Sequence, residues 1–105
     1  MRAVIVVTDL LARSRLQEAA AAAGYEVSLR REVPGPEEPP PEVLVVDLDV
    51  PGALEGVAAW RKSHAGPRVV GFAFHEEGEL IERARGAGIE VVPHGATARP
   101  ARLFS

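Results

Sequence analysis

Short apolar runs alternate along the chain with longer segments in which apolar residues recur at helical spacing. Most of the runs are rich in valine, and an uninterrupted apolar run is typical of a strand covered on both faces of a parallel sheet. Apolar positions three and four residues apart indicate amphipathic helices between the runs. The pattern predicts strands over Ala3–Val7, Tyr25–Val33, Val43–Leu48, Val69–Phe74 and Ile89–Val92, and helices over Leu10–Ala23, Ala53–Ser63 and Glu76–Ala87.

Each predicted helix has one stripe of residues that we expect to face a core. The stripe of the first helix consists of small residues, whereas the second helix adds a tryptophan and the third has larger aliphatic residues. These inward positions are Ala12, Leu16, Ala19, Ala20 and Ala23, then Leu54, Val57, Ala58 and Trp60, then Leu80, Ile81, Ala84 and Ala87.

The second predicted strand and the segment after it differ from the rest. In Tyr25–Val33 apolar and polar residues alternate, which is more typical of a strand at a sheet edge. Pro34–Pro41 is too rich in proline for a helix or a central strand, so we predict a stiff, extended connection. A proline-rich ligand for a partner domain is the alternative, but the segment contains no basic anchor.

The order of the elements predicts the topology. Strands that alternate with helices imply right-handed crossovers and a parallel sheet with helices on both faces. The five-stranded form has the strand order 2-1-3-4-5, with a switch point between its first and third strands. We therefore predict a single three-layer α/β domain with a flavodoxin-like sheet, in which no helix joins the second strand to the third.

Acidic residues follow the first and third strands. Ligands of such sheets bind outside the carboxyl ends of the strands, where Asp9, Asp47 and Asp49 would converge. Carboxylates of this kind can hold Mg²⁺, and an aspartate beside the ion can attack phosphate. On residue types alone we favour a simpler interpretation, in which Thr8 or Asp9 caps the first helix and Asp47 merely ends its strand.

Over Arg2–Val92 the chain resembles the receiver domains of two-component response regulators. The resemblance is strongest at VLVVDLDVPGALEG, residues 43–56, because receivers carry their phosphoacceptor aspartate at the position of Asp47, followed by a Pro-Gly turn. It implies a CheY-like fold, with Asp47 as phosphoacceptor and Asp9 as a Mg²⁺ ligand. Asp49 lies where receivers offer a backbone carbonyl to the ion, and its side chain could add to the site.

Several positions depart from the receiver pattern. Thr8 replaces one of two acids, Ala73 replaces the serine or threonine that binds the phosphoryl group, and Pro93-His94 replaces a Lys-Pro pair. The second and fifth helices are also missing. The contacts that bind and read the phosphoryl group are therefore lost, although His94 could stand in for the lysine as a cation. We predict a degenerate pseudo-receiver, a signalling and protein-interaction module that works without phosphorylation and is not an enzyme.

Two other functions remain as alternatives. One is a true phosphoacceptor receiver that uses Asp47 and Mg²⁺, and the other is a small-molecule or nucleotide-binding domain that uses the same crevice. A transition-metal site of His75, His94 and Asp47 is conceivable, but we favour exposed loop histidines, and we expect His64 at the surface. Apart from Mg²⁺ in the phosphoacceptor alternative, no cofactor is expected.

Composition narrows the range of partners and compartments. The net charge of −3 implies no broad basic face, so nucleic acid is not an expected partner. The absence of cysteine excludes disulfides and thiolate sites. The first apolar run is short and ends at Asp9, so we expect neither a signal peptide nor a membrane span, and a cytoplasmic protein. The absence of asparagine and the nine prolines fit a thermophilic source or a GC-rich genome.

The residues after the last strand show no period. We divide the chain into a receiver-like domain, 1–93, and a C-terminal tail, 94–105. The missing fifth helix would leave an apolar flank of the sheet exposed, which monomers rarely tolerate. Either Leu103 and Phe104 of the tail fold over this flank, or a second copy covers it, and the bolder form of the prediction is a homodimer.

Overall fold

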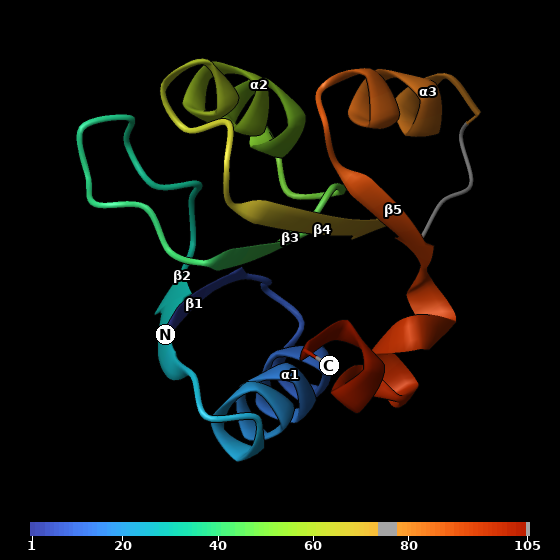
Figure 1. Cartoon of the computed structure of the whole chain (residues 1–105). Helices are drawn as coiled ribbons and strands as arrows, with labels where there is room; N and C mark the ends of the chain where they lie inside the picture. Colours follow the sequence, from blue (N-terminus) through green and yellow to red (C-terminus); the bar gives the residue numbers. More distant parts are fainter. Residues whose placement is uncertain (74–77, 105) are drawn as a thin grey trace.

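Two of the valine-rich runs form the centre of the sheet in the computed structural model, which describes residues 1–73 and 78–104 (Figure 1). Strands β1 (Arg2–Val6) and β3 (Val43–Asp47) pair in parallel, with Val6 opposite Val46. All five residues of β3 are buried. The apolar character of both sides of these strands is thus explained, because layers of chain cover both faces.

The other strands extend the sheet on either side of this pair. β2 (Glu26–Arg30) lies beside β1, while β4 (Arg68–Ala73) and β5 (Glu90–Pro93) follow β3. All pairings are parallel and the order is β2-β1-β3-β4-β5, which confirms the predicted topology. β2 is half-exposed, as an edge strand should be, but it is shorter than the predicted strand.

Three helices cover the two faces. Figure 1 shows α2 (Ala53–Ser63) and α3 (Gly78–Gly86) on one face, and α1 (Leu10–Ala22) with the C-terminal segment on the other. The predicted range of the second helix is confirmed, and that of the first is one residue too long. The predicted start of the third helix and the last residue of the fourth strand lie outside the described residues.

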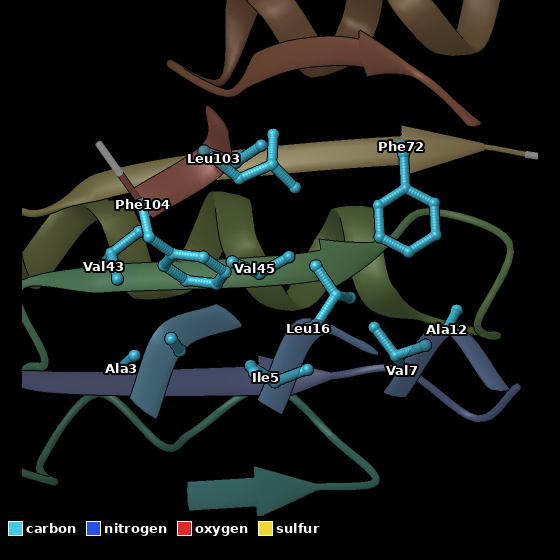
Figure 2. Packing of buried hydrophobic residues seen from close by; sticks show 12 residues of the cluster. Ala3, Ile5, Val7, Ala12, Leu16, Val43, Val45, Phe72, Leu103 and Phe104 are labelled. Atoms are coloured by element: carbon cyan, nitrogen blue, oxygen red, sulfur yellow. The ribbon is translucent and has the colours of Figure 1, made fainter. Parts of the chain in front are cut away.

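The core on the α1 face is built around aromatic and branched residues from several elements. Figure 2 shows Phe72 of β4 above Leu16 and Val7, with Leu103 and Phe104 over Val43 and Val45; all of them are buried. The predicted inward positions Ala12, Leu16 and Ala20 are confirmed. Ala23 is exposed, contrary to prediction, because it is the C-cap residue and lies beyond the last turn of α1.

The core on the α2/α3 face contains Trp60, which is 1% exposed, together with Leu54 and Val57. Ala58 was wrongly predicted to face inward and is exposed. Gly71 of β4 allows a close approach here, because an added Cβ would lie 2.8 Å from the Ile89 side chain. The Leu48 side chain packs against the same glycine.

The C-terminal segment forms two 3₁₀ helices, η1 (His94–Ala98) and η2 (Pro100–Phe104), where no regular structure was predicted. Leu103 and Phe104 are 4% and 6% exposed, and the Phe104 ring lies 5.8 Å from the Tyr25 ring, centroid to centroid. The prediction that these two side chains fold over the flank is confirmed. A second copy on this flank stays a prediction, as does the division at residue 93.

A proline-rich loop, residues 31–42, joins β2 to β3 and contains no helix, as predicted. It is not extended throughout, because residues 36–38 form a turn in which the Glu38 N–H donates to the Gly35 carbonyl at 3.1 Å. Two neighbouring elements hold this loop in place: Arg30 of β2 pairs with Glu38 at 2.9 Å, and the ring nitrogen of His64, the C-cap residue of α2, lies 2.9 Å from the Pro36 carbonyl oxygen. Val33 has left the sheet and packs against Gly56 of α2, which explains why β2 ends early.

The described residues include no helix with the length and apolar character needed to cross a membrane.

Candidate functional site

The candidate site lies at the carboxyl edge of the sheet, where β1 and β3 end side by side. Because Val6 is opposite Val46, the residues that follow these strands leave the sheet together. Asp47 is the last residue of β3, and Asp9 follows β1 as the residue before α1. The topology therefore brings these two predicted site residues to one edge, at the switch point of the sheet.

Asp47 is 3% exposed and its carboxylate takes part in the turn that follows it. The Asp49 backbone N–H donates to Asp47 Oδ1 at 2.9 Å, and the Val50 N–H donates to the Asp47 carbonyl at 3.1 Å. This is an Asx turn, in which an aspartate side chain substitutes for a backbone acceptor. The turn continues to Gly52, whose positive φ of 77° favours glycine, and α2 begins at the next residue.

Asp9 is exposed and caps α1. Its Oδ1 accepts a hydrogen bond from the Ala12 backbone N–H at 2.9 Å, and its own backbone is extended. A capping aspartate ordinarily accepts a hydrogen bond from a backbone N–H in the first turn of its helix. Of the two predicted capping candidates, Thr8 and Asp9, the structure selects Asp9.

Asp49 is exposed and contributes its backbone N–H to the turn at Asp47. Oxygen ligands such as these aspartates suit Mg²⁺. However, no group of three or more His, Asp or Glu side chains in the described part of the chain is arranged to hold a metal ion. A Mg²⁺ ion bound by Asp9, Asp47 and Asp49 therefore stays a prediction.

Ala73 and Pro93, the last residues of β4 and β5, carry no side-chain group that donates to an anion. Ala73 ends β4 and is paired with Pro93 of β5. A methyl group and a proline ring offer neither the hydroxyl nor the amine that the receiver pattern has at these positions. The backbone of His94 begins η1. The conceivable transition-metal site of His75, His94 and Asp47 includes His75, which lies outside the described residues.

A shallow hollow of about 300 Å³ adjoins the turn, between Val33 of the proline-rich loop and residues 50–53. Its volume is at the lower end of the range typical of small-molecule sites. Its lining includes one ionisable side chain, Glu32. Apart from Glu32, the side chains of its lining offer no hydrogen-bonding group.

Two features of the structure escaped the sequence analysis. Leu10 and Leu11 are 70% and 60% exposed at the start of α1, next to Asp9. Their positions off the Ala12–Leu16–Ala20 stripe could have revealed this. His64, predicted as a surface residue, is half-buried, and its ring packs 5.1 Å from that of Trp60. No local signal in the sequence indicates the contact of His64 with the Pro36 carbonyl, which joins the end of α2 to the proline-rich loop.

No family model matches the sequence, and no curated protein matches it. Several solved structures share its fold. A CheY-like response regulator receiver domain from Methanospirillum hungatei JF-1 has a TM-score of 0.78 at 17% identity, covering 89% of this chain and 80% of that chain. The orphan response regulator HP1043 of H. pylori has a TM-score of 0.75 at 14% identity, covering 98% and 92%.

The N-terminal domain of an uncharacterized protein from Wolinella succinogenes has a TM-score of 0.76 at 22% identity, covering 99% of this chain and 89% of that chain. All three identities are low, so the likeness concerns the fold. The chain has the fold of a response-regulator receiver domain, with a parallel five-stranded sheet and three α-helices.

Proposed function

We propose that the chain is a receiver-like signalling module that acts by binding a protein partner in the cytoplasm, without phosphorylation of Asp47 and without catalysis. The receiver-domain fold supports the signalling part of this proposal. The two exposed leucines beside the candidate site support the binding part, because side chains of this kind commonly contact partners when they are grouped at a surface.

The observation that carries the proposal is the pair Ala73–Pro93 at the ends of β4 and β5. Transfer of a phosphoryl group needs donors and cations that stabilise the charge on its oxygens. Neither residue has a side-chain donor, and Pro93 lacks even a backbone N–H. A phosphoryl group on Asp47 would therefore lack the two side-chain contacts that the receiver pattern supplies.

The arrangement at Asp47 supports a structural role for this residue instead. One carboxylate oxygen already accepts the Asp49 N–H and so shapes the turn into α2. An asparagine could make the same hydrogen bond through its amide oxygen. Asp47→Asn is therefore a variant that removes the phosphoacceptor chemistry and retains the turn.

Incubation with acetyl phosphate and Mg²⁺, followed by intact-mass measurement, tests the proposal. We expect no gain of a phosphoryl group in the wild-type chain or in Asp47→Asn. A gain in the wild type that is lost in Asp47→Asn and retained in Asp49→Asn would establish the phosphoacceptor function and overturn the proposal. The double variant Ala73→Thr/Pro93→Lys restores a hydroxyl and an amine, and a gain confined to it would show that these two groups are what is missing.

The homodimer is a separate part of the prediction. Leu103 and Phe104 occupy the flank that a second copy was expected to cover, so a dimer there would have to pack against the C-terminal segment. Light scattering measures the mass in solution directly. A dimeric mass that becomes monomeric when Ala101 or Arg102, both exposed on this segment, is changed to Glu would support the homodimer.

A further inference from the structure

An open groove of about 510 Å³ runs between α1 and the C-terminal segment. Arg15, Glu18 and Ala19 of α1 line one wall, and residues 98–102 line the other. The two walls are far apart in sequence. They meet because Leu103 and Phe104 dock the C-terminal segment onto the α1 face of the sheet, as Figures 1 and 2 show.

The charge of this groove is opposite to that of the chain. Arg15, Arg99 and Arg102 line it, all three are exposed, and Glu18 is the one acidic residue of the lining. The chain as a whole carries a net charge of −3. The remaining residues of the lining are alanines and one proline. The groove thus combines three arginine side chains with small apolar residues.

We propose that this groove binds an extended, carboxylate-rich segment of a partner protein. A guanidinium group offers a planar set of donors that matches a carboxylate with two parallel hydrogen bonds. Clusters of arginine that recognise acidic motifs are a recurrent mode of peptide binding. Because the groove is open along its length, it suits a chain lying across it better than an enclosed small molecule.

The site depends on tertiary structure. Arg15 belongs to a helix and Arg99 to the junction between η1 and η2, so a ligand that contacts both must find the C-terminal segment docked. A ligand that binds only the docked form stabilises that form. Binding should therefore slow amide hydrogen exchange in residues 94–104.

The inference rests on the proposed function, since it identifies the surface and the chemistry of the partner. Fluorescence anisotropy of a labelled peptide of alternating Glu and Ala, titrated with the full chain at low ionic strength, tests it. We expect saturable binding that weakens as salt is added. Arg99→Glu and, independently, Arg15→Gln should each weaken it about fivefold, the effect of about 1 kcal/mol per exposed ion pair.

Arg31→Glu is the matched control, because Arg31 is exposed on the proline-rich loop outside the groove. Circular dichroism of each variant checks that it is folded. Equal weakening by Arg31→Glu and Arg99→Glu, or no saturable binding of the peptide, would overturn the inference. Stronger competition by inorganic phosphate or a single-stranded oligonucleotide than by unlabelled peptide would also overturn it. None of these results alters the phosphorylation assay, so the two proposals can fail separately.

Discussion

The two faces of the sheet are covered by different kinds of chain. On one face α2 and α3 lie side by side, and Trp60 fills the space between helix and sheet. On the other face a single helix, α1, presents Leu16 between the small side chains of Ala12 and Ala20, and the C-terminal segment adds Leu103 and Phe104. Both faces are well buried, although only one is covered entirely by α-helix.

The difference shows that two well-placed side chains can take over the covering role of a helix. Leu103 and Phe104 lie over the centre of the sheet in Figure 2. Arg68 secures them, because its Nη1 donates to the Leu103 carbonyl at 2.7 Å while its other nitrogens pair with Glu90. A short 3₁₀ segment has few hydrogen bonds of its own, so this cover should open more readily than α2 or α3.

The largest effect is expected on the helical face. Trp60→Ala should lower the free energy of unfolding by about 3–5 kcal/mol, because it removes a fully buried ring and leaves a cavity. Chemical denaturation measures this loss. Trp60→Phe should cost much less, since the buried Nε1 has no hydrogen-bond partner that would be lost. Equal losses in the two variants would contradict this account of the face.

The second effect concerns the C-terminal segment. Phe104→Ala should lower the free energy of unfolding by about 2–3 kcal/mol, less than Trp60→Ala, because the segment can detach while the sheet stays folded. Hydrogen exchange should speed up first in residues 94–104. Leu29→Ala, at a side chain that is 37% exposed, is the control and should change stability by less than about 0.5 kcal/mol. Equal effects of Phe104→Ala and Leu29→Ala would show that the segment does not cover the sheet.

The smallest effect is a pH dependence at the edge of the α1 face. The hydrogen bond and charge of Arg68 lower the pKa of Glu90 from its ordinary value of 4.5. The ionised pair therefore adds stability above pH 4.5, and this contribution is lost as the pH falls through the lowered pKa of the folded state. Since both side chains are more than a third exposed, the contribution is about 0.5 kcal/mol or less.

Glu90→Gln removes the titrating group. The free energy of unfolding of this variant should therefore fall less between pH 5 and pH 3 than that of the wild type. Urea denaturation at a series of pH values makes the comparison. If Glu90→Gln and the wild type lose the same stability between pH 5 and pH 3, other carboxylates account for the loss.

Much of the fold could be predicted because the spacing of apolar residues indicates each helix and strand, and the order of these elements follows directly from the sequence. The valine-rich runs indicated the central strands, and the alternation of elements was sufficient for the order β2-β1-β3-β4-β5. Errors arose where position along an element, rather than residue type, decided burial. Ala58 has an apolar side chain on the solvent side of α2, and Val33 leaves the sheet to pack on Gly56.

The site could be predicted only in part. The sequence located Asp9 and Asp47 at one edge, but residue types do not distinguish an aspartate that shapes a turn from one that receives a phosphoryl group. The groove at Arg15 and Arg99 had no sequence signal, because it exists only when distant segments pack together. The thermophilic source also stays a prediction, and a melting temperature in the mesophile range would contradict it.

The central claim is that the receiver-domain fold is present without a working phosphoryl site at Asp47. Amide proton–nitrogen correlation spectra, recorded during titration with Mg²⁺ and then beryllofluoride as a phosphoryl mimic, test it without depending on a reaction rate. The account predicts no saturable shifts at Asp9, Asp47 or Ala73. Saturable shifts at these residues that are absent from Asp47→Asn would contradict it.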